Sequence, residues 1–502
     1  MSKGTRGALM RGAVWIGVAR ILTNLIGLAS TVILARLLSP DDFGLVAIAS
    51  AFAIITATIT ELSLSEALIQ HDEPSEDHYH TAFSLNLTRG FLLAAVVALL
   101  AWPAAVFYGD PRLSGIILGL AGGVFVGGLV NPKLVIFERR LEFHQWIFLG
   151  VAEKLSGFIV AIALAIAFQS YWALVLGQIV SQCARAATSY VLISYRPRLT
   201  FRHYRDLLSF SIWLTLGQAV QAINWRSDPL ILGYFLPTAQ LGQFSVGGRV
   251  TNIAISEVLQ PISKVLFPAF ARLKHDADRL RQAYLRSQGL LFLAACPIAL
   301  GLAVLAEPLV MLLIGKQWLD AVPVIQILAI AGLAQRFVNV GSLVMATGHT
   351  KALFGRDVRA LIIRMPCILT GLLLAPSAGL SSLVGATIGI TLSSLLNALW
   401  NMQLIANVTQ ISMADQVSIL WRPLIAGAVM GALVMIADAH WNFGAGFAAM
   451  AASLAVSVAL GAAVYLLTIF LLWRFTGRAD SPEREAAYLA AALLSRMRGA
   501  RA

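Results

Sequence analysis

Cysteine and charge are both scarce in this sequence. Its 502 residues include only three cysteines, Cys183, Cys296 and Cys367, and each of them lies within an apolar stretch. This excludes the disulfide framework that holds many small secreted domains together. Charged residues make up 12% of the chain, whereas a typical soluble domain has roughly 25%. The composition therefore argues against a soluble protein.

Long polar connections are lacking as well. The longest segments between apolar stretches inside the chain are 195–206, 269–285 and 307–320. None of them is long enough for a soluble domain, since domains rarely have fewer than about 50 residues. The function must therefore reside in the apolar segments and in the polar residues within them.

Apolar segments run through the whole chain. Hydrophobic residues make up 58% of it and the mean hydropathy is +0.79. The apolar runs have about 20 residues, the length with which a helix spans a bilayer. We predict an all-α, multi-pass membrane protein with about fourteen transmembrane helices. The predicted spans are 12–37, 44–69, 82–107, 113–137, 146–168, 171–194, 207–235, 239–268, 286–306, 321–346, 353–375, 379–407, 417–437 and 445–473.

The basic residues of the loops predict an orientation. With the N-terminus inside, the cytoplasmic segments hold 24 Lys and Arg residues, and the other side holds only Arg36, Arg112 and Lys316. Such an excess marks cytoplasmic loops, so we expect both termini in the cytoplasm. The same bias explains the net charge of +12. In a soluble protein that charge would suggest a nucleic-acid partner, which we do not expect here.

A faint internal repeat at an offset of 198 residues predicts two similar halves. The stretch 33–44 aligns with 231–242 without a gap, and both stretches end in glycine, Gly44 and Gly242. Six spans separate the two, so the halves share one orientation and a pseudo-twofold axis along the membrane normal. The predicted domains are an N-terminal six-helix bundle (1–206), a C-terminal six-helix bundle (207–408), two additional transmembrane helices (409–475) and a cytoplasmic tail (476–502).

Cations outnumber anions inside the predicted spans. A charge at the bilayer centre costs roughly 2.5–3.5 kcal/mol, so these residues must face one another, the bundle interior or water. The cations are Arg20, Arg89, Lys133, Lys154, Arg185, Arg226, Arg249, Lys264, Arg336 and Arg364, and the anions are Glu61, Glu66, Glu153, Asp228 and Glu257. An excess of cations around an internal cavity favours an anionic ligand.

Polar residues also follow single faces of the predicted helices. In the eighth span Arg249, Asn252 and Ser256 are spaced at i, i+3 and i+7, and in the first span Arg20 and Asn24 at i and i+4. We predict that an anion-binding cavity is lined by Arg20, Asn24, Arg89, Arg226, Arg249, Asn252 and Arg336. Ion coupling could involve Glu61, Glu66, Asp228 and Glu257.

Structural roles remain open for many of these residues. Uncharged polar side chains commonly form hydrogen bonds between transmembrane helices, and the four carboxylates could do the same. Lys133, Lys154, Arg185 and Arg364 lie near the cytoplasmic ends of their spans and could extend their charges to the membrane surface.

Three histidines, His71, His78 and His80, occur near Asp72, Glu73, Glu76 and Asp77. Their spacing matches no metal-binding motif. We interpret the segment as a solvated loop and predict no metal site.

The order of five motifs resembles a known family. They are ARLLSPDDFGLV at 35–46, NWRSDPLILG at 224–233, LGQF at 241–244, LFPAF at 266–270 and GKQWLDAVP at 315–323. Together they resemble the polysaccharide exporters of the multidrug/oligosaccharidyl-lipid/polysaccharide superfamily, in particular the exopolysaccharide flippases of the colanic-acid and succinoglycan type.

The resemblance implies a transporter of the bacterial inner membrane. Such a protein would move undecaprenyl-pyrophosphate-linked oligosaccharide repeat units to the outer leaflet by alternating access of two bundles. It would contact membrane lipids and could meet a polysaccharide polymerase or the export machinery. Flipping makes no covalent bond, so we expect no catalytic residue, no cofactor and no enzymatic activity.

Two alternatives remain. A multidrug or organic-cation antiporter of the same superfamily would need an acidic cavity, and the charge balance here has the opposite sign. A membrane glycan polymerase, ligase or glycosyltransferase would need carboxylates or histidines in sizeable loops outside the cytoplasm. Those loops are short here and contain only scattered acidic residues and one histidine.

Overall fold

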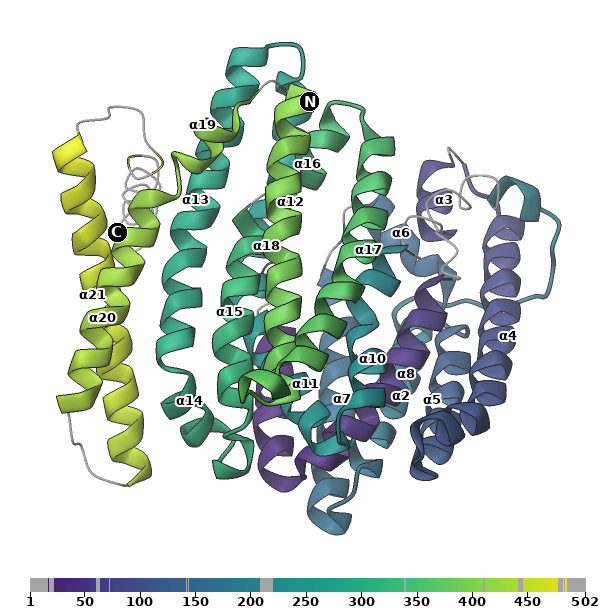
Figure 1. Cartoon of the computed structure of the whole chain (residues 1–502). Helices are drawn as coiled ribbons and strands as arrows, with labels where there is room; N and C mark the ends of the chain where they lie inside the picture. The colour runs from purple at the N-terminus through teal and green to yellow at the C-terminus, as the bar shows by residue number, and fades with distance from the viewer. Residues whose placement is uncertain are drawn as a thin grey trace, which may run out of the picture. The chain divides into compact units, whose positions relative to one another are not determined.

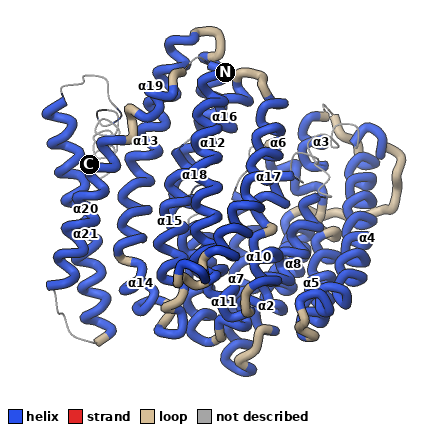
Figure 2. The backbone as a smooth tube through the Cα atoms, in the orientation of Figure 1, coloured by secondary structure: helices blue, strands red, loops and turns tan. Residues whose placement is uncertain are grey.

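The computed structural model describes residues 17, 22–59, 64–71, 73–140, 142, 144–207, 220–337, 340–409, 411–440, 446–476, 482 and 484. For residues 59, 256–265, 336, 337 and 350 only the backbone is described. Every regular element in these ranges is helical, and no strand occurs among them (Figures 1 and 2). The predicted all-α class is therefore confirmed.

The chain divides into two compact units, Met1–Val246 and Gly247–Ala502. The domain limits predicted at 206/207, 408/409 and 475/476 are based on the sequence repeat. A division of the chain into compact units does not test them, so they stay predictions. Residues 485–502 of the predicted tail lie outside the described part of the chain.

The first unit begins with a helix over Leu22–Leu37. It continues with α2 (Pro40–Ile59), α3 (Leu64–Gln70), α4 (Glu76–Tyr108), α5 (Arg112–Gly127), the 3-10 turn η1 (Pro132–Leu134), α6 (Val135–Arg139), α7 (His144–Phe168), α8 (Trp172–Leu192), a helix over 220–226, α10 (Asp228–Phe235) and α11 (Thr238–Asn252). The last few residues of α11 belong to the second unit.

The second unit continues that helix through a π-helical turn, η2 (Ile253–Glu257), into α12 (Val258–Leu273). It then contains α13 (Ala277–Val304), α14 (Ala306–Leu313), η3 (Lys316–Trp318), α15 (Ala321–Phe337), α16 (Val340–Ala346), α17 (Thr350–Leu374), η4 (Pro376–Ala378), α18 (Ser382–Thr409), α19 (Met413–Val417), α20 (Trp421–His440) and α21 (Phe447–Thr476). Helices α20 and α21 pack side by side (Figure 1).

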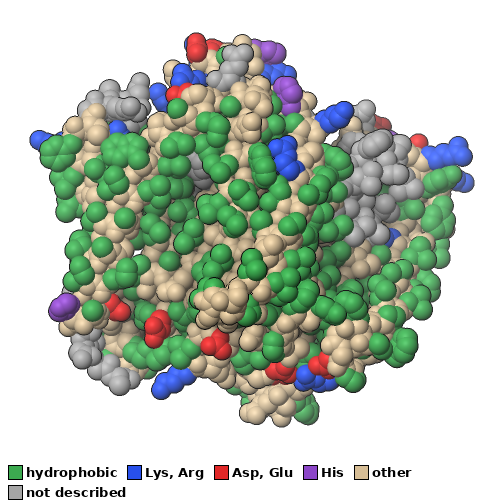
Figure 3. Space-filling model, in the orientation of Figure 1, with side chains coloured by type: hydrophobic (Ala, Val, Ile, Leu, Met, Phe, Trp, Pro, Cys, Tyr) green, Lys and Arg blue, Asp and Glu red, His purple; other side chains and the backbone are tan. Residues whose placement is uncertain are grey.

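Each of the fourteen predicted spans overlaps at least one described helix. Eight helices in the described ranges are long and apolar enough to cross a membrane, and a ninth is obtained if one bent pair counts as a single span. On the face seen in Figure 3, hydrophobic side chains cover the middle of the helices and charged side chains gather near their ends. The chain is therefore a multi-pass membrane protein.

Two spans that were expected to be continuous are broken. The span 113–137 is bent by 58° between α5 and η1–α6, where the Asn131 side chain accepts a hydrogen bond from the Lys133 amide and Pro132 follows directly. The span 207–235 is interrupted at Ser227, just before Asp228 and Pro229 begin α10. Proline lacks an amide hydrogen and fixes its own backbone, so it starts a helix more easily than it continues one.

Small residues let neighbouring helices approach closely in both units. A Cβ at Gly177 on α8 would meet Ala161 and the carbonyl of Gly157 on α7, and a Cβ at Gly385 on α18 would overlap the carbonyl of Gly371 on α17. Such contacts hold helices together in a bilayer, where apolar burial supplies little driving force.

The two stretches matched by the internal repeat contact each other. A Cβ at Gly44 would overlap the carbonyl of Thr238, and a Cβ at Gly242 would overlap the carbonyl of Pro40. Gly44 and Gly242 are repeat-equivalent, and so are Pro40 and Thr238. The two contacts are therefore the same contact seen from each helix, as a pseudo-twofold axis between α2 and α11 requires.

Loops of the first unit gather at two ends. At the Asp41 end, which comprises segments 38–42, 109–112, 169–172 and 236–239, Asp41 pairs with Arg112 at 2.8 Å and accepts a hydrogen bond from the Thr238 hydroxyl. Asp42 accepts a hydrogen bond from the Tyr171 amide at 3.1 Å. Arg112 holds the pKa of Asp110 below its usual range through hydrogen bonds.

At the His78 end, the contacts link segments 71–78, 130–142 and 193–206. Lys133 pairs with Glu76 at 2.7 Å, and Arg202 pairs with Asp77 at 2.9 Å. The loops around Arg139 and Arg202 supply most of the basic loop residues of this unit. By the positive-inside rule, we expect the His78 end to face the cytoplasm.

The orientation can be tested with reporter fusions. A reporter that is active only in the cytoplasm should be active after Ala502 and silent when the chain is truncated after His440, because α21 lies between the two positions. A reporter active only outside the cytoplasm should give the reverse pattern. The opposite pair of results would overturn the orientation predicted from the loop charges.

Candidate functional site

Several predicted site residues lie outside what the structure describes. Arg20 and Glu61 are among the residues that are not described, and only the backbone is described for Arg336 and Glu257. Arg336 lies in the last turn of α15, and Glu257 ends the π-helical turn η2. Their predicted roles stay predictions.

Arg89 and Asn24 are partly buried in the first unit. The Arg89 guanidinium donates a hydrogen bond of 2.5 Å to the backbone carbonyl of Ala57, which ties α4 to α2. Asn24 lies on the half-buried side of the helix Leu22–Leu37, whereas its exposed side carries Leu22 and Leu25. Arg89 therefore forms a hydrogen bond that holds two helices together, and its predicted role at the anion-binding cavity stays a prediction.

Two of the span cations are paired. Arg185 on α8 contacts Glu153 on α7 at 3.1 Å. Lys133 contacts Glu76 and also lies 5.5 Å from the centre of the Tyr195 ring. Each of these two cations is therefore paired with a carboxylate of the first unit.

Helix faces exposed on α4 and α21 are apolar. The exposed large side chains of α4 are Phe91, Leu92, Val96, Leu99, Leu100, Trp102, Val106 and Phe107, and those of α21 include Val458, Leu466, Leu467 and Phe470. Such faces suit contact with lipid chains. These two faces serve as a reference for the side chains expected on a lipid-facing surface of this chain.

The exposed face of α11 differs from those surfaces. Among its fifteen residues, all of which are described, only Ala239, Arg249 and Asn252 are exposed. No ion pair or hydrogen bond of the Arg249 side chain occurs within the described part of the chain. Because an unpaired guanidinium in hydrocarbon is costly, this face of α11 must meet water or an anionic group.

Arg226 belongs to a similar exposed group. The side chains of Gln221, Trp225 and Arg226 are exposed in the helix 220–226, and no ion pair of Arg226 is found among the described residues. Asn224, on the other side of that helix, is buried. The prediction that Arg226 and Arg249 line an anion-binding cavity stays a prediction.

Three of the predicted cations lie near the ends or irregular turns of their helices. Arg226 directly precedes Ser227, Arg249 lies about one turn before η2, and Arg336 lies in the last turn of α15. An interrupted helix leaves backbone amides and carbonyls without their usual partners, and such breaks are frequent at binding sites in transporters.

The two predicted coupling carboxylates with described side chains, Asp228 and Glu66, lie on different helices of the first unit. Asp228 is buried and begins α10, where a negative charge favours the positive end of the helix dipole. Glu66 is exposed on the short helix α3. A structural role for Asp228 therefore has a local explanation.

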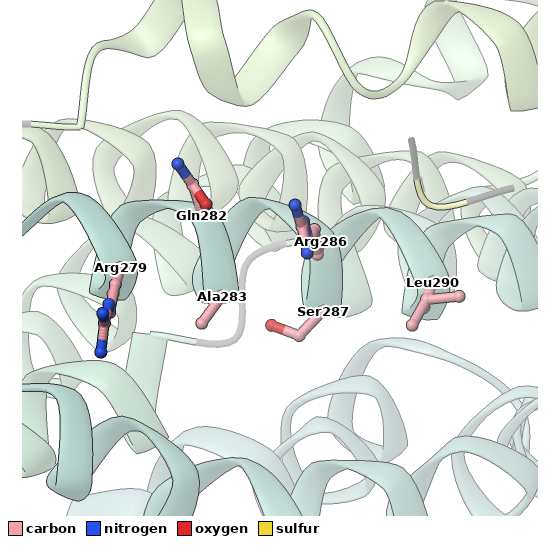
Figure 4. Close-up of a pocket in the computed structure, with 6 residues that line it drawn as sticks. All are labelled: Arg279, Gln282, Ala283, Arg286, Ser287 and Leu290. Carbon is pink, nitrogen blue, oxygen red and sulfur yellow. The ribbon is translucent and has the colours of Figure 1, made fainter. Parts of the chain in front are cut away.

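A surface hollow occurs elsewhere in the second unit. It has a volume of about 320 Å³ and is lined along one side of α13 by Arg279, Gln282, Ala283, Arg286, Ser287 and Leu290 (Figure 4). None of the predicted site residues lines it.

Cysteine labelling can test whether the polar face of α11 is wet. In a variant without the three native cysteines, Asn252→Cys should react readily with a small charged thiol reagent, because water allows the thiolate to form. Leu466→Cys on the apolar face of α21 is the control and should react far more slowly. Equal, slow labelling at both positions would contradict a water-facing α11.

Comparisons with known proteins agree with this architecture. The family described as polysaccharide biosynthesis protein matches residues 33–323. The lipopolysaccharide biosynthesis protein WzxC of Escherichia coli (strain K12) is 25% identical over 397 residues, which cover 77% of this chain and 79% of WzxC. The succinoglycan biosynthesis transport protein ExoT of Rhizobium meliloti (strain 1021) is 29% identical over 325 residues, or 64% of this chain and 65% of ExoT.

A solved structure of the lipid II flippase MurJ in an inward closed conformation shares the fold. The TM-score is 0.71 at 13% sequence identity, over 93% of this chain and all of the MurJ chain. The family match covers more than half of the sequence. The chain therefore belongs to the polysaccharide biosynthesis protein family, which confirms the resemblance found in its motifs.

Proposed function

We propose that this protein flips lipid-linked oligosaccharide repeat units across the bacterial inner membrane for exopolysaccharide or lipopolysaccharide biosynthesis. The family match and the names of WzxC and ExoT support the pathway. The fold shared with a lipid II flippase supports the kind of transport. The observation that carries the proposal is the exposure of the Arg226 and Arg249 side chains, for which no ion pair is found among the described residues.

The substrate we propose is an undecaprenyl-pyrophosphate-linked glycan. Its pyrophosphate is anionic, and the planar guanidinium of arginine stays charged and can donate two parallel hydrogen bonds to a phosphate. The glycan and pyrophosphate would occupy the wet, cationic surface while the lipid tail remains in the bilayer. Separate arginines allow release more readily than a closed cage of ligands would, and a transporter has to release its substrate.

The multidrug and organic-cation alternative fits less well. A site for cations needs an accessible carboxylate in the spans. Among the described span residues, Glu153 is paired with Arg185 and Asp228 is buried at the start of α10, which leaves Glu66 on α3 as the exposed carboxylate. A single exposed carboxylate is opposed by the exposed cations Arg226 and Arg249. Coupling to an ion through Glu61 or Glu257 is compatible with either substrate.

A glycan polymerase or ligase also fits less well. At the Asp41 end, which we expect to face outward, Asp41 and Asp110 both pair with Arg112. Asp42 accepts hydrogen bonds from the Ser39 and Tyr171 amides. These carboxylates hold loops together, and they do not form the open acid–base pair that glycosyl transfer requires.

We further propose that the contact between α2 and α11 is a gate at the outward end. It joins the two repeat halves through the backbones of Gly44 and Gly242. In alternating access, this contact would separate when the cavity opens outward. The protein would reside in the inner membrane with both termini in the cytoplasm.

Replacing the exposed arginines tests the anion site. Arg226→Ala and Arg249→Ala should each lower polysaccharide export at least tenfold, because a hydrogen bond to a charged group contributes roughly 1.5–3 kcal/mol. Lysine at either position should retain part of the activity, since it keeps the charge. We expect the same of Arg20→Ala. The measurement is exported polymer together with lipid-linked glycan accumulating in the cytoplasmic leaflet.

Arg140→Ala provides a matched control, because Arg140 is exposed in a loop at the His78 end. It should leave export unchanged. Normal export by the alanine variants at positions 226 and 249, at normal protein level, would contradict the proposed site.

Substitution of Gly242 tests the gate. Gly242→Leu should force α11 away from α2, because even a Cβ overlaps the Pro40 carbonyl. A cysteine at position 252 should then be labelled from outside several-fold faster by a membrane-impermeant thiol reagent. Gly248→Ala on the same helix is the control, since its Cβ would make only ordinary contact with Leu328. Unchanged labelling in a stably inserted Gly242→Leu protein would rule out the gate.

A further inference from the structure

Three imidazole rings lie close together at the His78 end of the first unit, and two of them stack. The ring centres of His78 and His203 are 3.9 Å apart with the planes 17° from parallel, and those of His71 and His78 are 4.4 Å apart. His78 is buried, at 7% exposure. The expectation of a solvated environment is therefore wrong for His78 and His80, which are buried near the start of α4.

A carboxylate completes the group. The possible ligand atoms of His78, His203 and Asp206 all lie within 4.8 Å of one another. Nδ1 of His203 is 3.4 Å from a carboxylate oxygen of Asp206. Two ligands of a tetrahedral zinc ion, each bound at about 2.0–2.1 Å, are separated by about 3.4 Å. This pair already has the spacing of two ligands on one ion.

The other side of the His78 ring has a partner that suits a metal ligand. Its Nδ1 accepts a hydrogen bond from the Ser75 amide at 3.2 Å and lies 2.7 Å from the Ser75 hydroxyl oxygen. To bind an ion through Nε2, the ring would carry its proton on Nδ1, which would then donate to the Ser75 hydroxyl in place of the bond from the amide. Hydrogen bonds of this kind fix the orientation of metal-binding histidines.

Other nearby charges are already engaged. Asp77 pairs with Arg202 at 2.9 Å, and Glu76 pairs with Lys133. His80 is turned away from the cluster and bonds through Nδ1 to the Tyr195 hydroxyl at 2.9 Å. Asp77, Glu76 and His80 are therefore each held by a partner outside the group of His78, His203 and Asp206.

We propose that His78, His203 and Asp206 bind a divalent transition-metal ion of the zinc class. Two imidazoles and a carboxylate are ligands that such ions favour, and water would complete the coordination. Because the rings are nearly parallel, one of them must turn for both nitrogens to meet the ion. His203 has the room, since its side chain is 28% exposed. The proposal does not rest on the transported substrate.

The ion would connect parts of the chain that are far apart in sequence. His78 lies in the first turn of α4, whereas His203 and Asp206 lie in the segment after α8. A bound ion would therefore fasten the start of α4 to the segment that leads out of the first six spans. Chelation should loosen this end of the first unit and leave the Asp41 end unaffected.

Metal titration of the full-length protein tests the proposal. The protein is purified in detergent, freed of metal with a chelator, and titrated separately with Zn²⁺ and Co²⁺. We expect close to one tightly bound ion per chain, a Co²⁺ absorption spectrum typical of four or five ligands, and a thermal unfolding temperature that rises with Zn²⁺ concentration.

His203→Ala and Asp206→Asn should each weaken Zn²⁺ binding at least tenfold and abolish the thermal shift. Both positions are accessible, so the metal-free variants should unfold at the parent temperature. If His203→Ala lowers the stability of the metal-free protein, His203→Gln, which keeps a polar side chain, is tested in its place. His275→Ala and His349→Ala replace exposed histidines outside the cluster and should bind Zn²⁺ like the parent. Equal binding by the parent, His203→Gln and Asp206→Asn would overturn the proposal, as would a parent that binds no ion.

Discussion

The cost of placing charge and unpaired backbone groups in hydrocarbon is the constraint on which this structure depends. It requires helices for the spans, and it sorts the faces of those helices. On α4 and α21 the exposed residues are large and apolar. On α11 they include Arg249 and Asn252. An exposed helix face can therefore meet either lipid or water. The polarity of its side chains decides which of the two it meets.

The helical class, the approximate positions of the spans and the family could be predicted from the sequence, because hydropathy and motif order are local properties. The helix interruptions at Ser227 and at Ile253–Glu257 could not be predicted in this way, although Pro229 was a signal for the first of them. Hydropathy measures how apolar a segment is and does not measure whether its backbone hydrogen bonds continue.

The partners of the charged residues were beyond the reach of the sequence. Arg185 pairs with Glu153 and Lys133 pairs with Glu76, each from a different helix, and His78 contacts His203, which lies 125 positions further along the chain. Helical periodicity tells which residues share a face, but a contact between two helices depends on how the bundle packs. The polar stripe containing Arg249 was detectable because it lies on one helix. The histidine cluster was not, because half of it comes from the segment after α8.

The first unit contains contacts within the first six spans and contacts between the two repeat halves. These two kinds of contact differ in strength. At the His78 end, Tyr195 is buried against Tyr79 and His80, and the ion pairs of Lys133 and Arg202 surround them. These contacts join segments of the first six spans to one another. The contact between α2 and α11, by comparison, rests on two glycines and the hydrogen bond from Thr238 to Asp41. At Gly44 and Gly242 that contact is made between backbone atoms, whereas separating the His78 end would strand buried polar groups. The buried polar groups of the His78 end therefore favour keeping the first six spans together as one body.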